Sequence, residues 1–472
     1  MIGIDERTEA TRDGARPMVR STDAAALAAE VAASVPAPTP APSPSSPAPG
    51  PGPLAALSDA GLEVPVLGGA FVRHVNLDVA ASAPAFDAVT AHVARVLPYY
   101  SSVHRGTGYP SQLATALVDD ARIAVARHVG ARLDDVVVFT RNTTDALNLL
   151  ASAVPGDTVV LDIEHHANLL PWERRGRRVV VARTTIAETL DALDDELRRC
   201  PAALVSVTGA SNVTGEVLPL SRIAELAHAH GARLAVDAAQ LLPHRRVDLA
   251  ASGIDYLAFS GHKAYAPFGA GALVGRADWL DRAPAHLAGG GAVDAVRLDA
   301  VDWKSGPERH EAGTPNVLGI AALARALAEL ERLGERARRE HEEALTARLH
   351  DGLAAQRGVR VIRGFDDADD RLGIATLELE RGSVGLVAAA LAAEHGISVR
   401  AGRFCAHPFF DRVATRANGL RASLGAGSSA DDVDRFLDAL ARLVADGPAH
   451  DYDRTPGGWC PRVDDRPRPS FA

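Results

Sequence analysis

The chain has 472 residues, of which 47% are hydrophobic and 23% charged, and its formal net charge is −10. This length and composition are ordinary for a globular protein with two or three domains and a large core. The acidic balance, without a basic patch interleaved with aromatic residues, argues against a nucleic-acid binder.

The cysteines and the apolar runs narrow the class of protein further. Cys200, Cys405 and Cys460 are too few and too scattered for a disulfide framework or a metal cluster, and they fit a reducing compartment. No apolar run approaches the ~20 residues of a membrane span, and the first residues lack the pattern of a signal peptide. We therefore expect a cytoplasmic protein without a metal site or membrane partner.

Residues 1–53 predict a disordered N-terminal segment that ends in a linker. The composition allows one short helix at Thr22–Ala33, and Pro36–Pro53 then alternates proline with small residues. Such a stretch sustains neither a helix nor a sheet ladder, so we expect it to be extended and solvated.

Residues 54–105 predict the N-terminal part of a small domain or a dimer region. Val75–Pro84 is typical of a short strand that runs into a turn of small residues, and a helix follows to about Leu97. Tyr99–Gly108 is a polar loop that contains glycine, and it leads into a helix from about Ser111.

Residues 106–330 predict a large α/β domain. From Asp135 onward, short apolar runs alternate with helical patterns, and the expected strands are Val136–Phe139, Thr158–Asp162, Arg178–Arg183, Ala203–Val207, Leu234–Val236, Tyr256–Phe259 and Ala272–Val274. Because continuous apolar strands are buried on both faces, the pattern indicates a mostly parallel sheet of seven strands covered by helices.

Residues 331–446 predict a smaller α+β domain of about a hundred residues. A long helical pattern connects the two domains and runs from Asn316 to about Leu353. The tail, residues 447–472, is rich in proline, arginine and aspartate and is expected to be irregular.

The most informative stretch surrounds Lys263. It follows the buried strand Tyr256–Phe259 and precedes a turn rich in glycine and proline, and only one other lysine, Lys304, occurs in the chain. An arginine cannot form a Schiff base, whereas a desolvated lysine amine can. We predict that Lys263 is an amine nucleophile rather than a surface lysine.

Other polar groups follow neighbouring strands, where ligands of parallel sheets bind. Thr143 and Thr144 open a helix and suit a phosphate, although helix capping explains them equally well in isolation. Ser260 and His262, beside the lysine, add two more candidate phosphate donors.

Asp237 and Gln240 follow a second strand. A buried carboxylate there needs a cationic partner, which a protonated pyridine nitrogen would supply, and Gln240 could reach a ring oxygen. His165 follows a third strand and could stack on a planar ring or carry a proton. The alternatives are a helix-capping aspartate and an ordinary surface histidine.

Two residues of the predicted small domain complete the set. Cys405 lies in a loop with Arg400 and Arg403, whose charges would favour a thiolate, although an inert buried thiol is the alternative. Arg421 opens a strand and suits a bidentate carboxylate clamp.

Together these motifs resemble class V aminotransferase-fold enzymes, and the most similar branch is the type II cysteine desulfurase/selenocysteine lyase family. The resemblance extends in order from about Val75 to Ala445 and rests on Ser260–Lys263 with Gly269 and Gly271, Val236–Gln240, Glu164–Asn168 with Pro171 and Trp172, Ser211–Gly215, and Glu311–Asn316. It implies fold type I, dependence on pyridoxal 5′-phosphate and a homodimer, with residues 106–330 as the cofactor-binding domain.

The resemblance also implies a role for each position. Lys263 corresponds to the Schiff-base lysine, His165 to the ring-stacking histidine, Asp237 to the partner of the pyridinium nitrogen and Gln240 to the contact of the ring oxygen. Thr144, Ser260 and His262 correspond to phosphate ligands with Thr143 beside them, and Thr314 to a residue that reaches the phosphate of the partner subunit. Asn212, Arg421 and His104 correspond to substrate contacts, and Cys405 to the cysteine that takes sulfur as a persulfide.

The sequence departs from this family near the substrate. Gly108 and Gly209 stand where histidines are common, and Gly425–Ser429 lacks the usual Tyr-Asn pair. The leading hypothesis is a cysteine desulfurase that converts L-cysteine to L-alanine and passes sulfur to an acceptor protein. The alternatives are a C–S lyase or another lyase, transaminase or epimerase of secondary metabolism without a persulfide, and a catalytically silent scaffold.

Overall fold

The computed structural model describes residues 50–471, so the predicted helix Thr22–Ala33 and the linker up to Pro49 lie outside the described residues. The last residues of the predicted linker, 50–53, are attached to the folded part of the chain. Pro51 O accepts a hydrogen bond of 2.9 Å from Ala430 N, at the start of helix α14 (Ala430–Ala445). Residues 50–53 therefore pack on the folded part, because the proline carbonyl satisfies a free N–H of that helix end.

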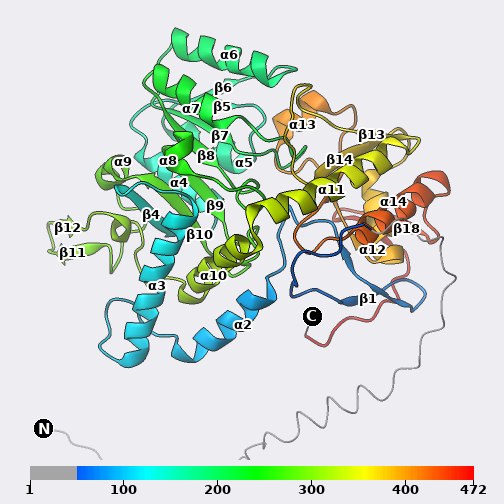
Figure 1. The fold of residues 1–472 in the computed structure, drawn as a ribbon, viewed down its shortest axis with the longest axis horizontal. Coiled ribbons are helices and arrows are strands. Elements are labelled where there is room, and N and C mark those ends of the chain that lie inside the picture. Colours follow the sequence, from blue (N-terminus) through cyan, green and yellow to red (C-terminus); the bar gives the residue numbers. More distant parts are fainter. Residues whose placement is uncertain (1–49, 472) are drawn as a thin grey trace, which may run out of the picture. The chain divides into compact units, whose positions relative to one another are not determined.

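A seven-stranded sheet forms the centre of the large domain (Figure 1). Its strands, in spatial order, are β4 (Asp135–Thr140), β10 (Gly271–Arg276), β9 (Tyr256–Ser260), β8 (Arg233–Asp237), β7 (Leu204–Thr208), β5 (Thr158–Leu161) and β6 (Arg177–Val180). Strand β10 is antiparallel to both of its neighbours, and the other pairs are parallel. The prediction of a mostly parallel sheet of seven strands is confirmed.

Helices cover both faces of this sheet, which explains why its central strands are apolar and buried. One buried cluster packs the sheet against α3 (Tyr109–His128), α6 (Ile186–Arg199), α7 (Leu220–Ala229) and α10 (Val317–Leu333). A second cluster packs the opposite face against α4 (Thr143–Ala153), the short helix α5 (His166–Leu169) and α9 (Ala277–Arg282). Helix α2 (Asp87–Val96) contacts α10, and α8 (Leu249–Ser252) leads into β9.

The small domain has its own antiparallel sheet and its own core. The strands, in spatial order, are β13 (Val359–Val361), β14 (Ile374–Leu379), β17 (Gly419–Ser423) and β16 (Arg400–Gly402), packed against α11 (Glu335–Ala354), α12 (Val384–His395) and α14. An early segment joins this domain, since β3 (Val75–Asn76) pairs in parallel with β15 (Ile397–Ser398) and Leu77 belongs to the same core.

The long connecting helix is divided. The sequence predicts one helical pattern from Asn316 to about Leu353, but the structure has two helices, α10 and α11, separated at Gly334. Gly334 has φ = +79°, a left-handed value that ends a helix and that glycine adopts without strain. Arginine- and glutamate-rich helical patterns on both sides conceal this break in the sequence.

Three hairpins have no counterpart among the predicted elements, namely β1 (Glu63–Pro65) with β2 (Phe71–Arg73), β11 (Val293–Val296) with β12 (Val301–Trp303), and β18 (Tyr452–Thr455) with β19 (Gly458–Pro461). Four short α-helices were not predicted either, namely α5, α8, α9 and α13 (His407–Val413). No helix within residues 50–471 combines the length and apolar character needed to cross a membrane.

The C-terminal tail corrects the expectation of an irregular segment. Its hairpin covers α12, and Trp459 lies so close to Gly385 that a Cβ there would be 3.1 Å from the Trp459 Cδ1 atom. The Glu394 carboxylate accepts hydrogen bonds from Ala449 N, His450 N and the Tyr452 hydroxyl at 3.0, 3.1 and 3.0 Å. The tail is ordered because this one carboxylate and the apolar outer side of α12 hold it.

We expect Glu394→Ala to loosen the hairpin, because three hydrogen bonds to a charged acceptor are lost together. The free energy of unfolding should fall by about 1–3 kcal/mol, and trypsin should cut at Arg454 and Arg462 faster than in the parent protein. Glu340→Ala is the control, since Glu340 pairs only with Arg336 on an exposed helix face. Equal digestion rates in the two variants would contradict this role.

Candidate active site

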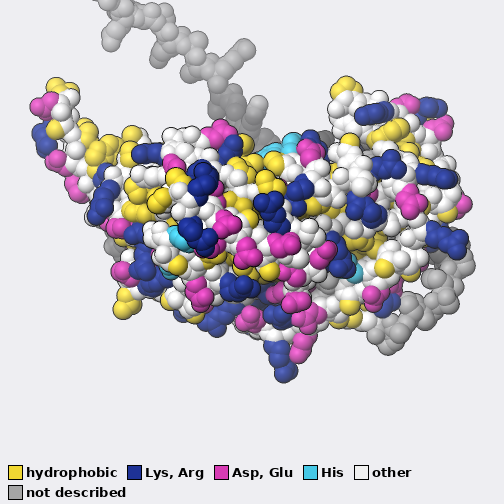
Figure 2. All heavy atoms as spheres, turned by 90° about the horizontal axis from the view of Figure 1, so that it is seen from above, with side chains coloured by type: hydrophobic (Ala, Val, Ile, Leu, Met, Phe, Trp, Pro, Cys, Tyr) yellow, Lys and Arg dark blue, Asp and Glu magenta, His cyan; other side chains and the backbone are white. Residues whose placement is uncertain are grey.

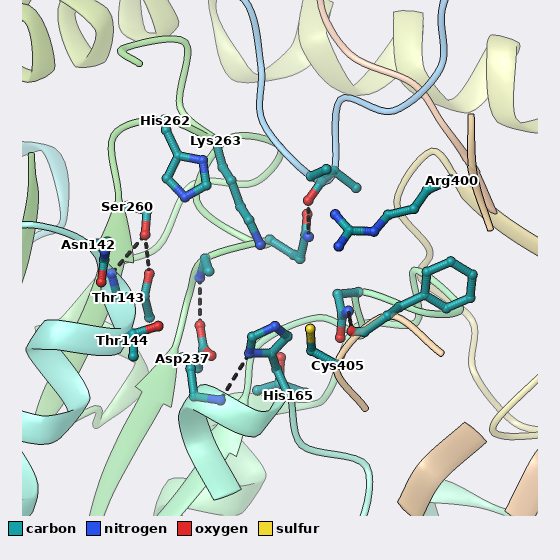
Figure 3. Close-up of a pocket in the computed structure, with 18 of the residues that line it drawn as sticks. Asn142, Thr143, Thr144, His165, Asp237, Ser260, His262, Lys263, Arg400 and Cys405 are labelled. Carbon is teal, nitrogen blue, oxygen red and sulfur yellow. Dashed lines mark hydrogen bonds between the residues drawn. The ribbon is translucent and has the colours of Figure 1, made fainter. Parts of the chain in front are cut away.

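A cavity of about 210 Å³ lies where the carboxyl ends of the central strands meet the small domain (Figure 3). The strand ends and the first turn of α4 supply one side, and the segments around β16 and β17 supply the other. The lining residues are Ala80, Ala81, Asn142, Thr143, Thr144, His165, Ala167, Thr208, Asn212, Asp237, Ala239, Gln240, Ser260, His262, Lys263, Arg400, Phe404, Cys405 and Arg421. Most of the predicted site residues are therefore brought together.

Lys263 projects its amine into this cavity from the turn after β9 (Figure 3). The turn is close-packed, since a Cβ on Gly261 would lie 2.7 Å from Ala270 O. Burial lowers the pKa of Lys263 from 10.5 to about 8, and the Asp237 carboxylate opposes this shift only in part. About a tenth of the amine is therefore unprotonated at pH 7, far more than for an ordinary lysine, as a nucleophile requires.

Asp237 ends β8 and is 4% exposed. Its Oδ1 accepts a hydrogen bond of 2.9 Å from Ala239 N, while burial raises the pKa of its carboxyl against the effects of that N–H and of Lys263. A further cation at this position would stabilise the ionised form. Gln240 donates from Nε2 to Ala80 O at 2.8 Å, which fixes its side chain at the cavity wall.

Hydroxyl groups gather at the N-terminus of α4. Thr143 N donates to Ser260 Oγ at 2.8 Å, and the two hydroxyls lie 2.7 Å apart. Asn142 caps the helix by accepting from Asp145 N, and Thr144 lines the cavity beside His262. Burial and the nearby Lys263 lower the pKa of His262. These hydroxyls and the helix end form a site that suits a phosphate.

His165 lies on the cavity wall with its ring held by a backbone contact. Its Nδ1 accepts from Ala167 N at 3.0 Å, and burial together with the charge of Lys263 lowers its pKa to about 3. The ring is therefore neutral at pH 7 and free to stack. Glu164, the residue before it, is fully buried, and burial raises the pKa of its carboxyl well above the ordinary range, with Asp237 and Asp162 adding to the shift.

Cys405 Sγ points into the cavity from a strained loop (Figure 3). Phe404 and Cys405 have φ values of 54° and 53°, left-handed conformations that cost non-glycine residues about 1–2 kcal/mol each. Asn212 Nδ2 donates to Phe404 O at 2.8 Å, and His166 N donates to Cys405 O at 2.7 Å. These hydrogen bonds help to hold the strained conformation.

Arg421 and Arg400 provide positive charge on the side of the small domain. Arg421 is 2% exposed and donates to Asn212 O and to Asp78 Oδ1, but its buried Nε lacks a partner among the described residues. The Arg400 side chain points toward the cavity centre (Figure 3). Asp78 was missed because the sequence shows it only as one polar residue in a turn of small residues.

Two predicted residues do not line the cavity. His104 Nε2 lies 3.1 Å from Asp119 Oδ1 on the exposed side of α3, away from the residues that line the cavity, and its contact with substrate stays a prediction. Thr314 follows Gly313, whose N–H donates to Gly290 O next to the β11–β12 hairpin. Its predicted reach to the phosphate of a partner subunit stays a prediction.

These residues fit one kind of cofactor. The buried amine of Lys263 suits an aldehyde, the carboxylate of Asp237 suits a protonated ring nitrogen, and the hydroxyls at α4 suit a phosphate. The neutral ring of His165 suits a stacked aromatic face. Pyridoxal phosphate carries all four features.

Comparisons with known proteins agree with this fit. The aminotransferase class-V family matches residues 75–436. A cysteine desulfurase of Dickeya dadantii is 37% identical over 361 residues, which cover 73% of this chain and 85% of that protein. A probable cysteine desulfurase of Mycolicibacterium paratuberculosis is 35% identical over 359 residues, which cover 74% of this chain, and the chain spans only 52% of that relative's length.

A solved structure gives the same result. The apo structure of a cysteine desulfurase from Thermococcus onnurineus NA1 superposes with a TM-score of 0.72 and 32% sequence identity, covering 79% of this chain and 94% of the other. The fold and the site thus define a pyridoxal-phosphate-dependent enzyme of fold type I. The chain belongs to the aminotransferase class-V family and, within it, to the cysteine desulfurases.

We expect the buried amine to make stability depend on pH. The pKa of Lys263 is lower in the folded state than in the unfolded chain, so its protonation opposes folding fully below pH 8 and progressively less between pH 8 and 10.5. Cofactor-free Lys263→Met should therefore exceed the parent protein in unfolding free energy at pH 7, and this advantage should shrink at pH 9.5. Urea titrations measure it, with Lys304→Met as the control outside the cavity. An advantage equal at both pH values would contradict the assignment.

Proposed function

We propose that this enzyme removes sulfur from L-cysteine, releases L-alanine and holds the sulfur on Cys405 as a persulfide. The observation that carries the proposal is the position of Cys405 Sγ in the same cavity as the Lys263 amine. A thiol at this point can reach a substrate that is bound beside the lysine.

The bound cofactor supplies an aldehyde for the substrate amine and a ring that accepts electrons from the α-carbon. Lys263 would hold the aldehyde, Asp237 the ring nitrogen, His165 the ring face, and Thr144, Ser260 and His262 the phosphate. With its amine free, Lys263 would be the base beside the substrate α-carbon, and its lowered pKa would suit removal of the α-proton.

Arg421 and Asn212 are the proposed ligands of the substrate carboxylate. The unpartnered Nε of Arg421 supports this, because a buried donor without a partner is costly and a carboxylate would satisfy it. Fixing the carboxylate at Arg421 leaves the substrate side chain free to point toward Cys405.

Cys405 then acts as the nucleophile on sulfur. Its thiolate forms an S–S bond with the substrate sulfur while the C–S bond breaks and the electron pair of that bond stays with carbon. A proton delivered to this carbon completes alanine.

We further propose a homodimer in the cytoplasm. Large apolar side chains are exposed on η1 (Leu97–Tyr99), the start of α3 and the β11–β12 hairpin, namely Leu97, Tyr99, Tyr100, Tyr109, Val296 and Leu298. Figure 2 shows this hairpin as an arm at the left edge of the molecule, with apolar and charged side chains on it. Exposed apolar groups of this extent suit a subunit contact, and free cysteines suit a reducing compartment.

Replacing the nucleophile tests the proposal directly. Cys405→Ser should lose alanine formation from L-cysteine by about a hundredfold or more, because an alcohol cannot accept the sulfur, while cofactor absorbance is retained. In the parent enzyme, mass spectrometry should detect an added sulfur on the Cys405 peptide. Cys200→Ser is the control, because Cys200 is also a free cysteine but does not line the cavity.

Full turnover by Cys405→Ser, with sulfide and pyruvate as products, would instead identify a C–S lyase. The same assay therefore distinguishes the proposed function from its main alternative, and analysis of the products after incubation with each candidate amino acid would identify the substrate class.

The subunit contact has its own test. Leu298, at the tip of the hairpin, is fully exposed, and Leu298→Asp should shift the protein from dimer toward monomer because it places a charge in an apolar contact. Light scattering after size exclusion measures the mass. Val463→Asp, at an exposed apolar residue of the tail, is the matched control. A monomeric parent protein would contradict the proposed dimer.

A further inference from the structure

The residue before Cys405 contacts both proposed ligands of the substrate carboxylate. On the basis of the desulfurase function above, we propose that Phe404 is a positioning residue that couples carboxylate binding to the placement of Cys405 Sγ. Nothing in the sequence pattern identified Phe404, because a single aromatic residue in a loop is more often part of a core.

The ring of Phe404 is held between a cation and the core. The Arg421 Cζ atom lies 5.2 Å from the ring centroid, and the Phe410 ring lies 5.9 Å away at an interplanar angle of 69°. The side chain is 5% exposed and lines the cavity. The ring therefore moves only if the Arg421 guanidinium or the core around Phe410 also rearranges.

The backbone of Phe404 is held by the second carboxylate ligand. Asn212 Nδ2 donates to Phe404 O at 2.8 Å, and Arg421 Nη1 donates to Asn212 O at 3.0 Å. Together with the contact between Arg421 and the ring, these bonds form a closed set of three contacts among Arg421, Asn212 and Phe404.

Cys405 follows this set directly in the chain. Because both Phe404 and Cys405 are left-handed, with φ values of 54° and 53°, a small rotation at Phe404 changes the direction in which Sγ points. A carboxylate bound to Arg421 competes with the aromatic ring for the guanidinium charge. A carboxylate bound at Arg421 therefore weakens the contact between the guanidinium and the Phe404 ring. By linkage, the position of the Phe404–Cys405 loop changes the affinity of the site for a carboxylate.

Alkylation of Cys405 measures this coupling without turnover. The holoenzyme is treated with iodoacetamide, with and without saturating propionate, a carboxylate that lacks an amine and sulfur. In the parent enzyme propionate should change the alkylation rate constant by about fivefold or more. In Phe404→Leu the change should disappear, and in Phe404→Tyr, which keeps the ring, it should remain. No change in the parent enzyme, or the same change in Phe404→Leu, would overturn the proposal.

Turnover separates positioning from folding. Phe404→Leu should reduce kcat for alanine formation from L-cysteine by about 10- to 100-fold, because Sγ is misplaced. Exchange of the α-proton of L-alanine with deuterium from solvent needs Lys263 but no thiol, and its rate at saturating L-alanine should be unchanged. Phe436→Leu, which trims a buried ring of the small-domain core outside the cavity, is the control.

Equal losses of turnover and proton exchange in Phe404→Leu would show a general structural defect and overturn the positioning role. Because alkylation is followed without cysteine, its result stands whether or not the parent enzyme forms alanine. Failure of the proposed function and failure of the coupling are therefore distinguishable.

Discussion

The buried carboxylate of Asp237 is the constraint on which the site depends. It lies at the end of a central strand and is almost inaccessible to solvent. Within residues 50–471, Lys263 is the cation that stabilises its negative charge. A carboxylate in such surroundings stays ionised only with a cation beside it. A protonated ring nitrogen of the cofactor would meet this need, so the buried charge that lowers the stability of the cofactor-free protein would strengthen cofactor binding. The lowered pKa of Lys263 follows from the same low-dielectric surroundings.

The central sheet and the cofactor residues could be predicted because their signals are local. An apolar strand followed directly by Asp237, by Ser260 or by the Thr143–Thr144 pair places these groups at the carboxyl ends of parallel strands, where topology brings them together. The division of the long helix at Gly334 was hidden, since nothing in the flanking helical pattern marks the left-handed residue. The pairing of Asp78 with Arg421 was also hidden, because 342 intervening residues separate them and no periodic pattern reports such a contact.

The site is shared between the two domains. The large domain holds the groups that suit the cofactor, whereas Arg400, Cys405 and Arg421 come from the small domain. The substrate would therefore be bound at the junction, with its amine toward one domain and its carboxylate toward the other. The bond between Arg421 and the carbonyl of Asn212 joins the domains at that point, beside further interdomain contacts such as the ion pair of Arg412 with Asp162.

Helix α12 is built almost entirely from apolar residues and glycine, and its two polar residues, Glu394 and His395, stand at its C-terminal end. Such a helix cannot face water alone, so it and the β18–β19 hairpin stabilise each other. The family match ends at residue 436, before this hairpin begins. The β18–β19 hairpin therefore covers an apolar face of the small domain, and a chain shortened after α14, without residues 447–472, would expose that face of α12 and tend to aggregate.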